Sequence, residues 1–310
     1  MTPPDARTLL ARHFITTPLV RAESLSGPGR TVHLKNETVL PTGSFKVRGA
    51  VYALSVNVER GPIREVVAAS TGNHGAAVAF AGRLLGIPAR IFLPDPPNPV
   101  KAARIRDQGA TLVATGIDLT AAIDAATAYV AAAGTGTFFL HDAADPDVPI
   151  GTATIGAEIL EQQPLVEVVY VPMGDTALIR GVASALKARS RSIRVVGVVA
   201  ANAPAYYLSW QAGGVIETQS SNTVADGLAV RRPLAANVAS IRQLVDDVVA
   251  VSEAEMLDAM ARLRSGEHIV AEPSGAAATA ALVRDKSPAG TCVALVTGGN
   301  IAPSLRARLK

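Results

Sequence analysis

Apolar and polar positions alternate along the chain in short blocks that predict strands and helices in turn. Runs of β-branched and other apolar residues predict strands over residues 65–70, 89–93, 166–171 and 194–199. Apolar residues at helical spacing predict helices over residues 75–85, 100–108, 119–132 and 178–190. A strand followed by a helix, repeated in this way, is typical of right-handed βαβ units and a largely parallel sheet.

Local signals sharpen this pattern. Residues 252–255 read Ser-Glu-Ala-Glu, a capping box that opens a helix running to about residue 263. The proline-rich segment 94–99 predicts a short loop between a strand and a helix, not a domain linker. Because open parallel sheets bind ligands beyond the carboxyl ends of their strands, we expect the chemistry in the loops that follow strands.

The composition agrees with a large α/β core. The chain has 310 residues, more than one domain usually holds, so we expect two lobes. Hydrophobic residues make up 49% and charged residues 18%, which is too apolar for disorder. The net charge of +3 is spread along the chain without aromatic residues among the basic clusters, which argues against a nucleic-acid partner.

The single cysteine and the amino-terminal segment indicate where in the cell the protein is expected. Cys292 excludes an internal disulfide and a cysteine metal cluster, and its apolar neighbours predict a buried strand position, not a nucleophile. The amino-terminal segment lacks the apolar core of a signal peptide, and no apolar run is long enough to span a bilayer. We therefore expect a cytoplasmic protein without a membrane partner.

Polar, glycine-bearing stretches interrupt the apolar pattern at four places. They are residues 34–50, 70–75, 171–181 and 296–300. Each has an ordinary explanation when taken alone: Lys46 as a solvated lysine at a helix start, Asn73 as a helix cap, and residues 298–300 as a turn. Their combination, in this order, is distinctive.

From about Leu10 to about Ala302 the chain resembles the β-family, or fold type II, of pyridoxal-phosphate enzymes, within its threonine/serine dehydratase and serine racemase branch. Further matching stretches are residues 151–158, 225–227, 244–248 and 272–276. The resemblance implies an α/β fold like that of tryptophan synthase β, with two open, largely parallel twisted sheets flanked by helices. It also implies a homodimer that binds pyridoxal 5′-phosphate.

The same resemblance implies a division into two domains. A small domain, residues 44–145, would be inserted into a large cofactor-binding domain made of residues 1–43 and 146–310, with the cofactor between them.

The resemblance also assigns roles around the cofactor ring. Lys46 would carry the cofactor as a Schiff base, and the freed amine would later take the Cα proton of the substrate. Phe45 would pack against the pyridine ring, and Asn73 would donate to the phenolic oxygen. Thr297 would hydrogen-bond the pyridine nitrogen. A hydroxyl is a poor acid and leaves that nitrogen largely unprotonated, which favours rapid loss of a β-substituent over transamination.

The turn after the strand at residues 65–70 is assigned to the substrate. Its backbone N–H groups and the helix start suit an α-carboxylate. The substrate-binding residues implied are Ser70, Thr71, Gly72, Asn73, His74 and Asp226. Thr71 is also a candidate acid/base, since serine racemases have a serine there, but carboxylate binding is the favoured interpretation.

The predicted phosphate cradle departs from the family. Dehydratases usually place four glycines in a row here, whereas this chain has Gly174, Asp175, Thr176 and Ala177, followed by Leu178. The helix start near Ala177 still offers N–H donors, and Thr176 adds a hydroxyl. Asp175 would repel a phosphate unless it points away.

No metal site is expected. Family members with a divalent cation use a Glu and an Asp where this chain has Val199 and Ala205, and the five histidines show no ligand spacing. The resemblance implies β-elimination from a β-hydroxy amino acid such as threonine, serine or a 3-substituted serine, giving a 2-oxo acid and ammonia. Because the chain ends soon after Thr297, we expect no regulatory tail.

Three alternatives stay open. Thr71 favours an amino-acid racemase, although the missing cation carboxylates disfavour it. A β-replacement transferase usually shows Asn-Thr-Gly where this chain has Asn73, His74 and Gly75. A non-catalytic cofactor-binding relative would explain the altered cradle, but the retained Lys46 argues against it.

Overall fold

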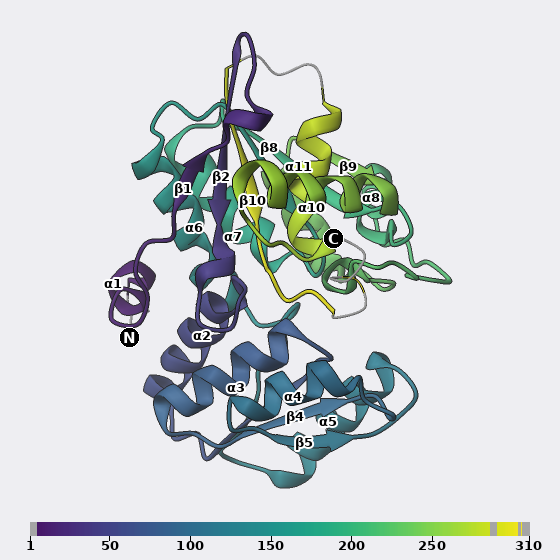
Figure 1. The fold of residues 1–310 in the computed structure, drawn as a ribbon. Coiled ribbons are helices and arrows are strands. Elements are labelled where there is room, and N and C mark those ends of the chain that lie inside the picture. The colour runs from purple at the N-terminus through teal and green to yellow at the C-terminus, as the bar shows by residue number, and fades with distance from the viewer. Residues whose placement is uncertain (1–4, 286–289, 303–304, 306–310) are drawn as a thin grey trace. The chain divides into compact units, whose positions relative to one another are not determined.

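A computed structural model describes residues 5–285, 290–302 and 305. The chain divides into two compact units (Figure 1). Unit 1 contains Lys46–Gly151 together with the amino-terminal segment that ends at Phe14. Unit 2 contains Ile15–Phe45 together with the segment that begins at Thr152. The sequence analysis placed the amino-terminal segment in the larger domain, whereas its helix α1 packs on α2 of unit 1.

Unit 1 is built on a four-stranded parallel sheet with the order β5-β4-β3-β6. Its strands are β3 (Glu65–Ala69), β4 (Ala89–Leu93), β5 (Thr111–Ala114) and β6 (Thr137–Phe139). Its helices are α1 (Ala6–Leu10), α2 (Lys46–Arg60), α3 (Asn73–Leu85), α4 (Pro99–Asp107) and α5 (Leu119–Ala133). Helix α6 (Val148–Gln162) begins in unit 1 and continues into unit 2.

Unit 2 contains a six-stranded sheet with the order β1-β2-β10-β7-β8-β9, in which only the β1–β2 pair is antiparallel. Its strands are β1 (Leu19–Arg21), β2 (Arg30–Asn36), β7 (Val168–Pro172), β8 (Arg194–Ala200), β9 (Asp247–Val251) and β10 (Gly290–Val296). Its other α-helices are α7 (Ala177–Arg189), α8 (Ala205–Ala212), α9 (Ala235–Leu244), α10 (Glu253–Glu267) and α11 (Pro273–Arg284). Short 3-10 turns are η1 (Glu23–Leu25), η2 (Glu37–Val39) and η3 (Asp226–Leu228). The expected fold class is confirmed.

Both faces of the unit 2 sheet are buried. Successive residues of β10 point to opposite faces: Cys292 and Ala294 pack with α10 and α11, whereas Val293 and Leu295 pack with α6, α7 and α9. This explains why the central strands β7, β8 and β10 are apolar at nearly every position. Cys292 is buried as predicted, and that burial raises the pKa of its thiol.

The predicted element boundaries hold to within a few residues, with physical reasons for the differences. Helix α3 starts at Asn73 with Gly72 as its N-cap, so the interpretation of Asn73 as the cap is wrong. Helix α10 continues past residue 263 to Glu267 and ends at His268, which adopts a left-handed conformation.

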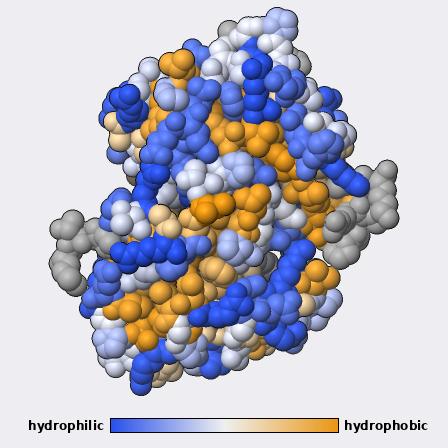
Figure 2. All heavy atoms as spheres, turned by 60° about the vertical axis from the view of Figure 1, so that its left-hand side comes forward, coloured by the Kyte–Doolittle hydropathy of each residue, from blue (hydrophilic) through white to orange (hydrophobic). Residues whose placement is uncertain are grey.

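No helix within the described ranges has the length and apolarity needed to cross a membrane. Exposed apolar side chains occur singly in both units, for example Ile15, Ile117 and Leu165. The face drawn in Figure 2 is a mosaic of hydrophobic and hydrophilic residues. Scattered apolar residues of this kind are ordinary at protein surfaces.

The first polar stretch of the sequence contributes a buried network to unit 2. Lys35, fully buried on β2, donates to Glu158 Oε2 at 2.6 Å, to Gln162 Oε1 at 2.8 Å and to the Thr17 carbonyl at 2.8 Å. The Thr17 hydroxyl lies 2.5 Å from Glu37 Oε1. Since β2 pairs with β10, this network supports the strand that immediately precedes Thr297.

Replacing Glu158 with alanine should lower the free energy of unfolding by about 3–5 kcal/mol, because Lys35 is then a buried cation without its carboxylate. The exposed Asp258–Arg262 pair provides the control: Asp258→Ala should change the free energy by less than about 1 kcal/mol. Urea unfolding followed by circular dichroism measures both. Equal effects of the two substitutions would contradict the structural role of the network.

Candidate active site

In unit 1, the predicted substrate turn joins β3 to α3. The first N–H groups of any helix have no partner within the helix. In α3 no side chain of the N-cap residue accepts from them. The Gly72 N–H donates to Ser70 Oγ at 3.1 Å, which fixes the turn between them. Gly75 is closely packed: a Cβ there would lie 3.0 Å from side-chain atoms of both Ile91 and Ile105, which would have to shift. A helix start of this kind suits a carboxylate, as the sequence analysis proposed for residues 70–73.

Lys46 begins helix α2, and its amine forms an ion pair with the carboxylate of Asp142. The two side chains are 15% and 12% exposed, so the pair is nearly shielded from water. Asp142 Oδ1 lies 3.5 Å from His74 Nδ1. The structure thus brings Lys46 and His74, two predicted site residues, together through a third residue.

The charges in this cluster set the protonation of Asp142. Burial alone would raise the pKa of the carboxyl, but the Lys46 charge and the hydrogen bond from Lys46 outweigh it and lower the pKa to about 2. Burial lowers the pKa of His74, while the negative Asp142 opposes that shift. At neutral pH the imidazole is therefore uncharged and the carboxylate is ionised, with Lys46 as its cationic partner.

Sequence reasoning missed Asp142. It lies just beyond β6, which pairs in parallel with β3, so both strand ends reach the same edge of the sheet. The available signal was a polar pair, His141 and Asp142, directly after the apolar run Phe138 to Leu140.

In unit 2, the predicted phosphate cradle connects β7 to α7. Gly174 is packed against the 225–228 segment: a Cβ at residue 174 would lie 2.1 Å from the Gly227 carbonyl. Thr176 adopts a left-handed conformation with φ of 70°, which is unusual for a β-branched residue. The carbonyl of Asp175 accepts from Asn237 Nδ2 at 3.3 Å, which anchors the loop. Asp226, the first residue of η3, is exposed. It is adjacent in the sequence to Gly227, whose carbonyl packs against Gly174.

The cradle fits a phosphate group. Thr176 is at the N-cap position of α7, but its side chain accepts no hydrogen bond from the helix. The first N–H groups of α7, beginning at Ala177, have no partner within the helix. Thr176 Oγ1 is buried and makes no hydrogen bond of ordinary geometry within the described chain. Ala177 and Leu178 are buried, which keeps water from competing for these donors. A buried hydroxyl beside a helix start without a side-chain cap is a site that an anion would complete.

Thr297 lies at the carboxyl end of β10 and is 4% exposed. Its carbonyl accepts from the Phe45 N–H at 3.0 Å, and the neighbouring Ser44 pairs with Gly298 in an isolated antiparallel bridge. Because β10 runs parallel to β7, Thr297 and the Gly174 loop end at the same edge of the unit 2 sheet. The structure therefore gathers the ring-binding and phosphate-binding candidates of this unit.

The predicted site residues are distributed over both units. Unit 1 gathers Lys46, Ser70 to Asn73, and His74, and unit 2 gathers Phe45, residues 174–178, Asp226 and Thr297. The assignment of both groups to one cofactor remains a prediction. In the described part of the chain, no group of three or more His, Cys, Asp or Glu side chains is arranged to hold a metal.

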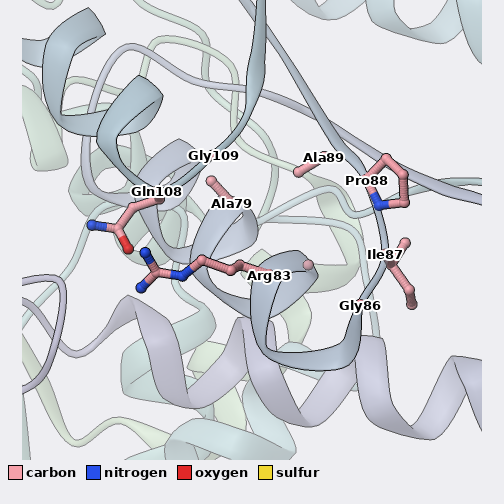
Figure 3. A pocket seen from close by; sticks show the side chains of 9 residues that line it. Ala79, Arg83, Gly86, Ile87, Pro88, Ala89, Gln108 and Gly109 are labelled. Carbon is pink, nitrogen blue, oxygen red and sulfur yellow. The ribbon is translucent and has the colours of Figure 1, made fainter.

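A pocket of about 230 Å³ in unit 1 is lined by residues that include Arg83, Gly86, Ala89 and Gln108 (Figure 3). The Arg83 and Gln108 side chains extend toward one another there. Ala89 begins β4, so this pocket lies at the amino end of that strand, opposite the edge that carries the candidate site. We assign it no part in the chemistry described above.

Comparison with known proteins identifies the family. Residues 10–298 match the sequence profile of the family described as "Pyridoxal-phosphate dependent enzyme". The "L-threonine ammonia-lyase" of Geobacter sulfurreducens is 35% identical over 300 residues, which cover 96% of this chain and 74% of that protein. The chain belongs to the pyridoxal-phosphate dependent enzymes, and its cofactor is pyridoxal 5′-phosphate.

Solved structures agree with this assignment. The structure of maize serine racemase matches with a TM-score of 0.90 and 29% identity, covering 98% of this chain and 94% of that one. The processed form of threonine deaminase isoform 2 from Solanum lycopersicum matches with a TM-score of 0.90 and 30% identity, covering 96% and 87%. The fold is that of fold type II pyridoxal-phosphate enzymes.

Replacing Thr176 with glycine should raise the free energy of unfolding of the cofactor-free protein by about 1 kcal/mol. Glycine adopts a left-handed conformation without steric cost, and the buried hydroxyl without a hydrogen bond is removed. Denaturant unfolding measures the change. Gly86→Ala provides the opposite control, since it places a side chain at a left-handed helix end and should be destabilising. A destabilised Thr176→Gly would contradict the strain at this position.

Replacing Lys46 with methionine should raise the pKa of Asp142 from about 2 to above its usual range, because burial then acts without the neighbouring cation. The carboxyl carbon shift of Asp142, followed by nuclear magnetic resonance during a pH titration, reports this pKa. An Asp142 that still titrates near the wild-type value in Lys46→Met would contradict the pairing.

Proposed function

We propose that this protein is a pyridoxal-phosphate-dependent ammonia-lyase that dehydrates and deaminates a β-hydroxy amino acid, such as threonine, serine or a 3-substituted serine. The products are a 2-oxo acid and ammonia. The observation that carries the proposal is the cluster of Lys46, Asp142 and His74, which places a lysine amine beside the start of an uncapped helix. A relative named as an L-threonine ammonia-lyase supports the same reaction.

Unit 1 supplies the groups that handle the substrate. The turn at Ser70, Thr71 and Gly72, with Asn73 at the start of α3, binds the α-carboxylate through backbone N–H groups. Lys46 takes the Cα proton at its Nζ, the electron pair of the broken Cα–H bond forms a Cα–Cβ double bond, and the β-hydroxyl takes up a proton and leaves as water. His74 lies next to Asp142, which pairs with Lys46. We also assign Asp226 to substrate binding.

Unit 2 supplies the groups that hold the cofactor. The start of α7, with the Thr176 hydroxyl, binds the phosphate, and Thr297 binds the ring nitrogen. When bound, pyridoxal phosphate provides an aldehyde that condenses with amines and a conjugated ring that withdraws electrons from Cα. Because a threonine hydroxyl does not protonate the ring nitrogen, the site favours quick loss of a β-substituent over transamination.

An amino-acid racemase is the second candidate, supported by the likeness to maize serine racemase. It needs an acid/base on the face opposite Lys46, and Thr71, partly exposed after β3, is the residue available for that role. Formation of the D-enantiomer from an L-amino acid without 2-oxo acid would favour racemisation. We further propose that the protein acts in the cytoplasm as a homodimer.

Incubation with a panel of β-hydroxy amino acids should release 2-oxo acid and ammonia in equal amounts. Lys46→Ala should reduce turnover by at least about 1,000-fold and abolish the visible absorbance of lysine-bound cofactor, because no other amine replaces the nucleophile and base. Lys101→Ala, a lysine of helix α4, is the matched control and should keep both properties. Wild-type turnover in Lys46→Ala would disprove the assignment.

A further inference from the structure

The two oxygens of Asp142 have different surroundings. Oδ2 is held by the amine of Lys46. Oδ1 is buried, makes no hydrogen bond within the described chain, and faces His74 Nδ1 at 3.5 Å. A carboxylate that keeps one buried oxygen unsatisfied is costly, so its position calls for a functional explanation.

His74 does not neutralise Asp142. Its Nε2 lies 2.9 Å from the Leu140 carbonyl, which can only accept, so the imidazole proton resides on Nε2. The other nitrogen, Nδ1, therefore turns a lone pair toward Asp142. Burial lowers the pKa of His74, which keeps this arrangement at neutral pH. Lys46 is thus the group that balances the carboxylate charge.

The backbone around Asp142 is fixed by the scaffold. The Leu140 N–H donates to the Val67 carbonyl of β3 at 2.9 Å, which extends the strand pairing to the residue before His141. The N–H groups of Ala143 and Ala144 lie 3.2 Å and 3.3 Å from His141 Nδ1. Asp142 is therefore held between two anchored points, so its contact with Lys46 follows from the fold and not from chance side-chain placement.

We propose that Asp142 is the positioning residue and counter-ion of Lys46, stabilising the form of its amine that carries the additional proton. When Lys46 acts as the base assigned above, the Cα–H bond breaks, the proton forms a new N–H bond at Nζ, and the electron pair stays with the substrate carbon. Asp142 pairs with the resulting ammonium, so it favours proton removal. The same pairing holds Nζ in place. This catalytic part of the proposal rests on the proposed function.

The pairing also has a consequence that needs neither cofactor nor turnover. A lysine amine reacts with acylating reagents only when it is neutral. In the cofactor-free full-length protein, Asp142 should protect Lys46 from acetic anhydride by favouring the ammonium. The charged or titratable groups around Asp142 are Lys46 from α2, His74 from α3 and the adjacent His141, so the pH profile must be recorded over the range in which each titrates.

The experiment compares acetylation of Lys46 across pH in wild type, Asp142→Asn and Asp145→Asn, by mass spectrometry with the Lys101 peptide as internal reference. Asp142→Asn should increase Lys46 labelling about tenfold at a given pH, equivalent to a shift of about one pH unit. Asp145 lies in the same loop and bonds the Asp147 and Val148 N–H groups, so Asp145→Asn should match wild type. Asp142→Glu, which keeps the charge, should lie nearer to wild type than Asp142→Asn.

Superimposable Asp142→Asn and wild-type profiles would overturn the proposal, as would an equal shift in Asp145→Asn. If Asp142→Asn does not fold, the titration of Asp142 in Lys46→Met decides: an unchanged carboxyl means no pairing. In the cofactor-loaded enzyme, Asp142→Asn should lower kcat more than about tenfold with little change in KM. A labelling shift without any lyase activity in wild type would leave the pairing standing and reject the proposed function instead.

Discussion

Parallel strand pairing is the constraint on which the whole candidate site depends. In a parallel sheet every strand ends at the same edge, so loops far apart in the sequence meet there. In unit 1 this brings the residues after β3 and β6 together, and the first residue of α2 joins them through its amine. In unit 2 it aligns the loop after β7 with Thr297 after β10. Each group of site residues is therefore a product of strand order and direction.

Lys35 and Lys46 are both paired with carboxylates, and the surroundings of the two pairs differ. Lys35 is fully buried and donates to a carboxylate, an amide oxygen and a backbone carbonyl, which is the pattern of a structural ion pair. Lys46 faces Asp142, whose second oxygen makes no hydrogen bond. An ion pair that leaves part of its hydrogen-bonding capacity unused retains the freedom to exchange partners, which a base at an active site requires.

The phosphate cradle shows how a family motif can change without losing its physical basis. Glycines are favoured where the chain turns left-handed or approaches another backbone closely. Gly174 meets the second condition because the Gly227 carbonyl fills the space of a side chain. Thr176 adopts a left-handed conformation despite its branched side chain. Its buried hydroxyl lies at the start of α7. In the proposed phosphate site, the donors come from the helix start and not from a glycine run.

The sequence by itself determined the alternation of strands and helices and the fold class, and it predicted the cofactor lysine and the stretches that surround it. Periodicity and helix-capping signals are local, so they can be read along the chain, and the motif at Lys46 is specific. Asp142 was not predicted, because its partner lies 96 residues away. The polar pair at residues 141 and 142 does not by itself show which residue Asp142 contacts. The strained Thr176 and the packed Gly174 depend likewise on neighbours that only folding brings close. The conformational preferences of neighbouring residues determine the helices and strands. Charge pairs such as Lys46 with Asp142 depend on contacts between distant residues, and these contacts exist only in the tertiary structure.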